Sequence, residues 1–416
     1  MSALPAHAVA ELAARQSYGR LLAILSARTR DIAASEDALA EAFAAALDSW
    51  PRDGVPANPL AWLLTVARRN VLDQWRHSQV REAAGETLLL MADELAAENE
   101  FSAVADERLR LLFVCAHSAI DPAARAPLML QTVLGLDVAR MAGAFLISPT
   151  TLSQRLVRAK TRVRAAGIPF TEPLAADLPQ RLQDVQDGIY AAYGTGWEDV
   201  DGADRARQGL TAEAIALGRI LCEQIPNEPE PAGLLAMMLF CESRANARRS
   251  AEGAYVPLDS QDTSLWDTDM MAEAEQRLMQ ASRMGRLGPC QLEAAIQSAH
   301  THRRLGRNVP APALVALYDG LLSFSPSLGA QVSRACAVAN ADGAASGLLA
   351  LDELQAQHPS ETQKYQPWWA ARAHLLVLAG QTGEAREAYV KAIGLASNIA
   401  VKAHLATKVQ ALSAAQ

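Results

Sequence analysis

Two segments far apart in this sequence carry apolar residues at the same spacing of 4, 3 and 4 positions. These residues are Leu60, Leu64, Ala67 and Val71 in the first segment and Leu152, Leu156, Ala159 and Val163 in the second. The spacing places four side chains on one face of an α-helix. Ala and Leu are abundant, and runs of β-branched residues, which favour strands, are scarce. We therefore predict an all-α fold.

Charge is distributed unevenly along the 416 residues, which carry a formal net charge of −8. Residues 1–170 hold 18 basic and 18 acidic side chains, so the whole net negative charge lies in residues 171–416. Residues 82–107 hold eight acidic side chains and no Lys or Arg, a composition typical of a linker. We predict four parts: a helical domain (1–81), this acidic linker, a second helical domain (108–170) and a long helical extension (171–416).

The second domain ends in the pattern of a helix-turn-helix. Asp137 and Ser148 are each suited to cap the start of a helix, and Pro149 suits the first helical position. The helix after Ser148 has its apolar stripe on one side and polar or basic side chains elsewhere: Thr151, Gln154, Arg155, Arg158, Lys160 and Arg162. Such a helix enters the major groove, where Gln and Arg read base edges and cations meet phosphates. The alternative is a solvated basic helix on an ordinary bundle.

The first domain is predicted to contain three helices, over Val9–Leu25, Ser35–Trp50 and Pro59–His77, with a proline-rich break over residues 51–59. The third helix interleaves basic and aromatic side chains, a combination suited to single-stranded DNA. Packing of Trp62 and Trp75 in the core, with a surface pair between Arg69 and Asp73, is an equal alternative. The second helix presents Asp37, Glu41 and Asp48 on its outer face, where they meet either a protein or solvent.

The extension ends in a spacing similar to that of a tetratricopeptide helix pair, in which small residues let two antiparallel helices approach. The positions are Trp369, Ala373, Leu376, Ala385, Tyr389 and Ala392, with Gly380 at the expected turn. A generic helical bundle is the alternative. Near the start of the extension, Tyr193–Asp199 contains two glycines and is predicted to form a turn.

Nothing in the sequence points to catalysis or to a bound metal. It contains no GxSxG, GK[ST], HExxH or GxGxxG pattern in a fitting context. Its five cysteines form no CxxC pair, and His300, His302, Cys115 and His117 make no four-ligand set. There is no signal-peptide pattern and no apolar run long enough for a membrane span. We expect a cytoplasmic protein that is not an enzyme, has no cofactor and does not enter the membrane.

The order of these features resembles the extracytoplasmic-function (ECF) sigma factors of bacterial RNA polymerase, in the subgroup with a C-terminal tetratricopeptide-like extension. Residues 17–77 look like sigma region 2 and residues 108–166 look like region 4. The stretches AEAFAAALDSWPRDGVPANPLAWLLTVARRN, QRLVRAK and GLLAMMLF carry the resemblance. It implies that core RNA polymerase and promoter DNA are the partners and that the extension modulates activity, with a protein or peptide as its own partner.

The resemblance also implies roles for individual residues. Residues matching the polymerase-docking helix are Asp37, Glu41 and Phe43. Residues matching the −10 element reader are Asn58, in a loop that captures a flipped base, and Trp62, Arg69, Asn70, Asp73, Gln74 and Arg76. Residues on the helix that faces the −35 element are Thr151, Ser153, Gln154, Arg155, Val157, Arg158, Lys160 and Arg162.

Two other functions remain open on the sequence alone. One is an ordinary helix-turn-helix regulator with a helical sensor domain, which would bind duplex DNA without polymerase. The other is a helical-repeat scaffold that touches no nucleic acid.

Overall fold

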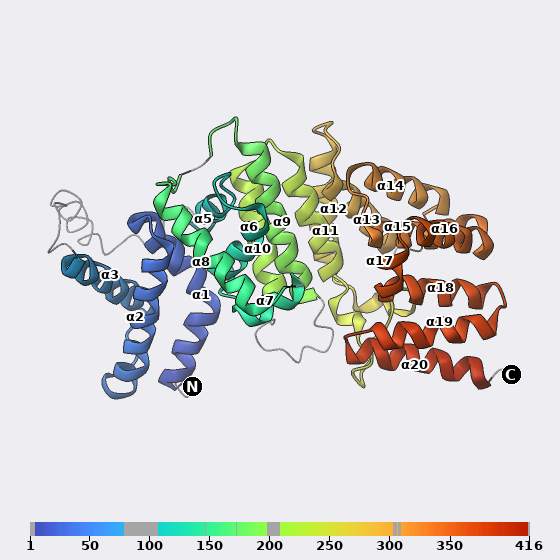
Figure 1. Cartoon of the computed structure of the whole chain (residues 1–416), viewed down its shortest axis with the longest axis horizontal. Helices are drawn as coiled ribbons and strands as arrows, with labels where there is room; N and C mark the ends of the chain where they lie inside the picture. Colours follow the sequence, from blue (N-terminus) through green and yellow to red (C-terminus); the bar gives the residue numbers. More distant parts are fainter. Residues whose placement is uncertain are drawn as a thin grey trace. The chain divides into compact units, whose positions relative to one another are not determined.

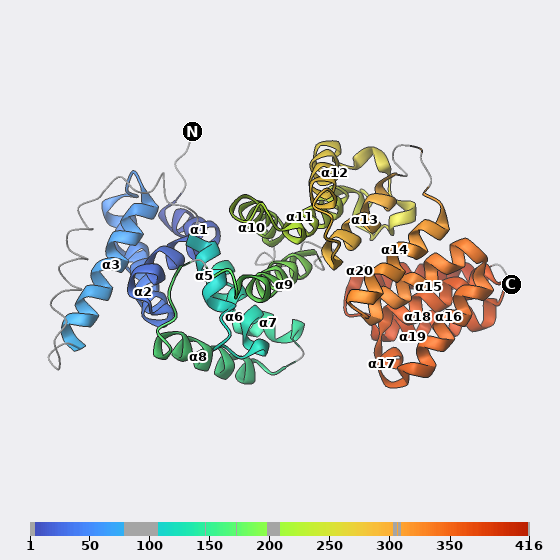
Figure 2. The same ribbon diagram turned by 90° about the horizontal axis from the view of Figure 1, so that it is seen from above.

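The computed structural model describes residues 5–78, 107–145, 147–171, 173–197, 209–302, 306 and 309–414. Within these ranges every regular element is a helix, and β-pairing is limited to one isolated bridge between Arg249 and Tyr255 (Figures 1 and 2). The predicted all-α fold is confirmed. The chain divides into two compact units, Met1–Thr195 and Gly196–Gln416, and each is described by itself.

The first unit begins with the three predicted helices, α1 (Ala6–Thr29), α2 (Ile32–Asp53) and α3 (Pro59–Ser78). Asp31 caps α2 by accepting a hydrogen bond from the amide of Ala34 at 3.1 Å. The helices pack around a core of fully buried leucines, which includes Leu21, Leu39 and Leu63. Helix α2 runs two residues past the expected break at Pro51, because a proline in the last turn leaves most of the hydrogen bonds of the helix intact.

Four helices follow: α5 (Glu107–Cys115), α6 (Pro122–Leu134), α7 (Val138–Ala144) and α8 (Pro149–Ala165). Most of the predicted acidic linker lies outside the described residues, and Glu107 is the first residue of α5. The helix-turn-helix is confirmed, with α7 first and α8 second. The Ser148 hydroxyl accepts from the Thr151 amide at 3.1 Å, and Pro149 opens α8 as predicted. The apolar stripe of α8, from Leu152 to Val163, is buried.

Helix α9 (Leu178–Trp197) packs against α6, although its residues were assigned to the extension. A Cβ atom on Gly188 would lie only 2.5 Å from the Met129 sulfur, so the two helices approach closely. The Arg125 guanidinium also donates to Asp184 at 2.7 Å, and both side chains are largely buried. The first compact unit therefore runs to Thr195 rather than ending at residue 170.

The turn predicted over Tyr193–Asp199 is wrong as far as Trp197, because α9 continues through both glycines. Helical glycines cost about 1 kcal/mol each relative to alanine. That cost is outweighed by the burial of Ala192 and Tyr193, which fixes the last turns of the helix.

The second unit consists of successive helices separated by the proline- and glycine-rich breaks seen in the sequence (Figure 1). They are α10 (Leu210–Gln224), α11 (Pro229–Glu242), α12 (Thr268–Ser282), α13 (Pro289–Thr301), α14 (Ala311–Phe324), α15 (Leu328–Asp342), α16 (Ala344–Gln357), α17 (Pro359–Lys364), α18 (Gln366–Leu378), α19 (Thr382–Leu395) and α20 (Ile399–Ala414). Three short 3₁₀ helices connect α11 to α12. Helix α11 is buried on all sides from Pro231 to Cys241, which makes it the core of the first half of this unit.

Helices α18 and α19 form the predicted antiparallel pair. Ala373, Ala385 and Ala392 are fully buried between them, and Tyr389 is nearly so. Gly380 lies at the turn with a φ of 77°, a left-handed conformation that favours glycine. The helix pair is thus confirmed, while the assignment of the whole extension to tetratricopeptide repeats stays a prediction.

Two half-buried acidic residues, Glu230 and Glu293, lie near the start of α13. Glu230 accepts hydrogen bonds from the amides of Cys290 and Gln291 at 2.9 and 3.3 Å, so its carboxylate caps the start of this helix. Glu293 lies one turn further along α13. Burial, and secondarily the charge of Glu230, raise the pKa of Glu293 to about 7.

The buried Arg125–Asp184 pair yields a prediction about the first unit. Replacing Arg125 by Ala leaves the Asp184 carboxylate, 16% exposed, without its partner. We expect the free energy of unfolding, measured with urea, to fall by about 3 kcal/mol. The matched control is Arg52→Ala, which breaks an ion pair whose two side chains are 66% and 76% exposed and should cost less than about 1 kcal/mol. Equal losses in the two variants would contradict the assignment of α9 to this unit.

Glu293 yields a prediction about pH. The pKa of Glu293 in the folded state is about 7, above the ordinary 4.5. The fold favours the protonated carboxyl, so its contribution to stability is complete below pH 4.5 and is lost as pH rises to 7. Stability of the second unit should fall by about 3 kcal/mol from pH 4.5 to pH 7.5 on this account. In urea unfolding, Glu293→Gln should remove this part of the dependence of the free energy of unfolding on pH. The control Glu353→Gln, at an exposed site on α16, should leave that dependence unchanged. If Glu293→Gln left the pH dependence of the free energy of unfolding unaltered, another group would be the one that titrates.

Candidate nucleic-acid interface

The face of α8 opposite its buried stripe is open to solvent. Its exposed members, which we call the α8 face, are Thr151, Ser153, Gln154, Val157, Arg158 and Arg162. Arg155 lies beside them and is half-buried. Val157 is 60% exposed, which is unusual for an apolar side chain and suits contact with a thymine methyl group. No acidic residue occurs on α8, so the face combines cations, hydrogen-bond donors and one apolar contact.

Lys160, which the resemblance placed with the −35 readers, lies apart from this face. Its Nζ atom is 2.5 Å from the Glu36 carboxylate on α2, and the Lys160 side chain is only 11% exposed. One turn later, the Arg164 guanidinium lies 3.3 Å from Asp31, which caps α2. Glu36 and Asp31 were not identified from the sequence as partners of α8, because they precede it by more than a hundred residues and no local pattern links them.

The residues predicted to read the −10 element differ in their surroundings. Asn58 is exposed, and its side-chain oxygen accepts from the Ala61 amide at 3.1 Å, so it caps α3. Arg69 is exposed, as is Asp73. Trp62 is half-buried and packs edge-to-face on Trp50, with ring centroids 5.5 Å apart. Arg76 lies in the last turn of α3, where the side chains are outside the described set.

Asn70 and Gln74 link α3 to α2. The Asn70 amide donates to the carbonyl oxygen of Ala38 at 3.2 Å, and the Gln74 amide lies 3.5 Å from a Glu41 oxygen. These contacts hold the two helices in register. Asn58 and Arg69 therefore offer polar atoms to a ligand, while Trp62 and Asn70 also support the fold.

The three residues predicted to dock on polymerase all lie on α2. Asp37 and Glu41 are exposed, and Phe43 is half-buried against the core of the first three helices. Asp37 and Glu41 therefore form an open acidic surface, while Phe43 contributes to packing.

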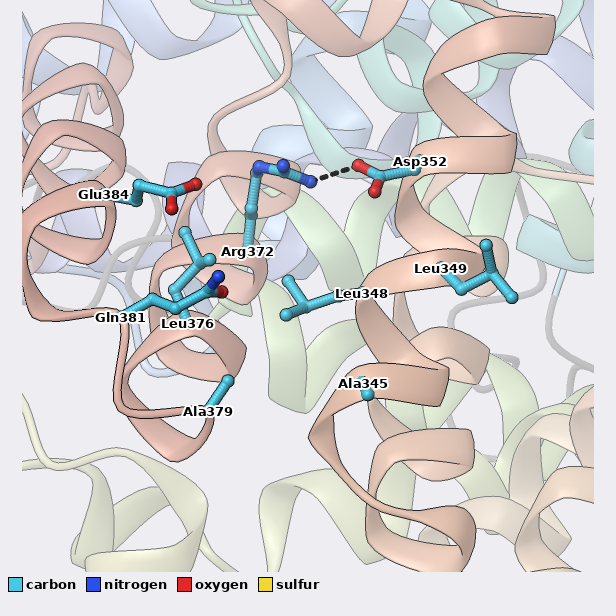
Figure 3. A pocket seen from close by; sticks show the side chains of 9 residues that line it. All are labelled: Ala345, Leu348, Leu349, Asp352, Arg372, Leu376, Ala379, Gln381 and Glu384. Carbon is cyan, nitrogen blue, oxygen red and sulfur yellow. Dashed lines mark hydrogen bonds and ion pairs between the residues drawn. The ribbon is translucent and has the colours of Figure 1, made fainter.

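The second unit has a groove between α16, α18 and the start of α19, with a volume of about 530 Å³ (Figure 3). Leu348, Leu349 and Leu376 give it apolar walls, and Arg372 forms an ion pair with Asp352 across it. Leu349 is 61% exposed, so one wall faces solvent. This groove mixes apolar and charged groups, as do surfaces that bind protein segments.

The described ranges contain no cluster of three or more His, Cys, Asp or Glu side chains that could hold a metal ion. Over the same ranges, no helix is long and apolar enough to cross a membrane.

Comparison with known proteins identifies two segments of the chain. Residues 14–81, which include most of α1 and all of α2 and α3, match the family model of sigma-70 region 2. Residues 181–282, from α9 to α12, match a family of unknown function, DUF6596. No solved structure matches the chain.

Two relatives extend this result. The chain is 36% identical over 405 residues to an uncharacterized protein of Rhizobium meliloti (strain 1021), with 96% of this chain and 94% of that protein aligned. It is 30% identical over 218 residues to RfaY of Xanthomonas campestris pv. campestris, described as a probable RNA polymerase sigma factor, with 50% and 51% of the two chains aligned. These matches identify residues 14–81 as a sigma-70 region 2 and support an ECF-like sigma factor with a C-terminal extension.

Proposed function

We propose that this protein binds core RNA polymerase in the cytoplasm and directs it to promoters, acting as a specificity subunit and not as an enzyme. The observation that carries the proposal is the open α8 face, free of acidic residues, in the same compact unit as a segment that matches sigma-70 region 2. An exposed helix of this kind fits the major groove, whose width admits one α-helix.

The side chains of α8 divide by chemistry. Gln154 and Arg155, near the start of the helix, are suited to base edges, because a Gln amide pairs with adenine and an Arg fork pairs with guanine. Arg158 and Arg162, one and two turns further, are suited to phosphates. In this arrangement the first half of α8 reads the −35 element, and the phosphate contacts of the second half fix the position of the helix along the DNA.

The first three helices supply the complementary half of the proposal. The exposed Asn58 and Arg69 would meet melted −10 DNA, and the acidic surface of Asp37 and Glu41 would meet polymerase. The charge balance supports this division of labour. The first 170 residues have equal numbers of basic and acidic side chains, so promoter affinity has to come from the assembly with polymerase.

The extension is proposed to modulate transcription, and the groove between α16 and α18 is its candidate site for a protein or peptide segment. The amphipathic lining of the groove, with Leu349 exposed beside Arg372 and Asp352, supports this role.

The deciding experiment is in vitro transcription with purified core polymerase. The proposal expects promoter-specific transcripts that depend on this protein. A helix-turn-helix regulator would instead shift duplex DNA in gels without polymerase and give no such dependence. A helical scaffold would do neither.

A base-reading Arg155 predicts a sequence-dependent defect. Arg155→Ala should weaken transcription from one −35 sequence by about 1–3 kcal/mol, or roughly 5- to 150-fold, and relax the preference at one base pair. Arg52→Ala, an exposed arginine on α2, is the control and should leave transcription intact. A uniform loss on all promoters would make Arg155 a phosphate contact.

Removal of Gly196–Gln416 tests the extension. A chain ending at Thr195 keeps the part of α9 that covers α6, and it should change the amount of transcript while keeping the promoter preference. Unchanged transcript levels would exclude a modulating role.

A further inference from the structure

The groove of the second unit lies where one helix pair, α15 and α16, meets the next, α18 and α19. Its floor is fixed, because the Trp368 indole on α18 donates to the carbonyl oxygen of Leu351 on α16 at 3.3 Å. Gly347 brings the same two helices close, since an added Cβ atom there would lie 2.9 Å from a methyl carbon of Leu375 on α18. The groove is therefore preformed, which lowers the cost of ordering it when a ligand binds.

One end of the groove is acidic. There Arg372 lies between Asp352 and Glu384 (Figure 3). The Arg372 guanidinium forms an ion pair with Asp352 and lies over the Trp368 ring at 5.4 Å, and its side chain is only 22% exposed. Glu384 is exposed and has no ion-pair partner among the residues that the structure describes. Two carboxylates around one guanidinium leave this end with a net negative charge.

The rest of the groove is apolar. Leu348 and Leu376 line its middle, and Ala345 and Ala379 line the end away from the charges (Figure 3). Leu349 continues this surface outward and is 61% exposed. Isolated exposed leucines are common on protein surfaces and need no explanation. This leucine is instead continuous with the lining of a groove, so it can anchor an apolar side chain of a partner.

We propose that the groove binds an amphipathic α-helix of a partner protein, with a basic side chain at the Glu384 end and apolar side chains over the leucines. This inference rests on the proposed function and deepens it by naming the chemistry of the partner. Charge complementarity supports a basic partner twice. Glu384 offers an uncompensated carboxylate at the site, and residues 196–416 hold 19 basic and 24 acidic side chains, so the unit as a whole attracts cations.

The walls of the groove select the conformation of the bound segment. They are α-helices, whose backbone N–H and C=O groups are already paired, so the groove offers side chains and no strand edge. An extended segment would leave its own backbone groups unpaired against the apolar lining, which is costly. A helix pairs its backbone groups internally and presents apolar side chains at positions i, i+3, i+4 and i+7 on one face.

The groove is too open for a small molecule. Pockets for small ligands bury most of the surface of the ligand. Here Leu349 and the Asp352 side chain, on the same wall, are 61% and 52% exposed. A helix covers such a wall along its length and removes both side chains from water at once.

The test uses the full-length protein and a displayed library of Ala-based helices of about 16 residues. One face of each helix varies among Leu, Lys, Glu and Ser. Sequences selected on the wild type are synthesised, and their Kd values are measured by fluorescence anisotropy. We expect enrichment of helices that combine Leu at i and i+4 with a Lys one turn away, and affinities that fall as salt is added.

Leu349→Asp tests the apolar contact. It should weaken binding of the selected helix by about tenfold or more, because an apolar side chain of the helix then meets a carboxylate. Val390→Asp is the matched control. Val390 lies on α19, is 55% exposed and is outside the groove lining, so this variant should bind as the wild type does. Circular dichroism verifies that both variants are folded.

Glu384→Lys tests the charge. It should weaken the Lys-containing helix by roughly five- to tenfold and strengthen a helix with Glu in place of that Lys, because the sign at the site is exchanged. Glu387→Lys is the matched control, at an exposed position on α19 that does not line the groove. It should leave the preference for Lys over Glu unchanged.

Selected helices that bind Leu349→Asp as tightly as the wild type would overturn the proposal. Enrichment of acidic helices, or of no helix, would overturn it as well, and so would a dimer of the protein that Leu349→Asp dissociates, because the occupant would then be a second copy. In each of these cases promoter-specific transcription by the wild type stays intact. Failure of the proposed function has a different signature, which is helix binding without any transcript that depends on the protein.

Discussion

The first unit depends on α6, a helix buried on nearly every side. Two glycines on neighbouring helices make this burial tight, Gly19 against Val133 and Gly188 against Met129. A larger residue at Gly19 would push α1 away from α6, because the close atoms there are backbone, whereas at Gly188 the Met129 side chain would have to move. Since α8 also packs on α6, the helices α1, α8 and α9 all share one support. A close-packed interior transmits a shift on one face of such a helix to the others, because the side chains have no free volume in which to absorb it.

The boundary between the two compact units falls within α9. Helix α9 runs without interruption from the residues that pack on α6 to Trp197. At its end the Arg248 guanidinium stacks on the Trp197 ring at 3.7 Å and donates to the Trp197 carbonyl oxygen at 2.7 Å. Within the first unit, α9 is held against α6 through the ion pair of Asp184 with Arg125.

The sequence was sufficient where the structure is local. Three predicted features each depend on contacts within one or two helices. They are the apolar stripe from Leu152 to Val163, the Ser148 cap, and the small residues between α18 and α19. Long-range pairs were not predictable in this way. Nothing near Lys160 indicates that its partner is Glu36, and a lysine among arginines was naturally assigned to DNA. Gly194 and Gly196 favour a turn by propensity, but the burial of the neighbouring Tyr193 stabilises a helix there instead.

The same long-range contacts reduce the number of cations that α8 leaves unpaired. Residues 140–164 hold six basic side chains, yet two of them, Lys160 and Arg164, form ion pairs with carboxylates at the start of α2. Each phosphate contact contributes to DNA affinity and to its salt dependence, and the largely buried Lys160 is less available for such a contact than the exposed Arg158 and Arg162.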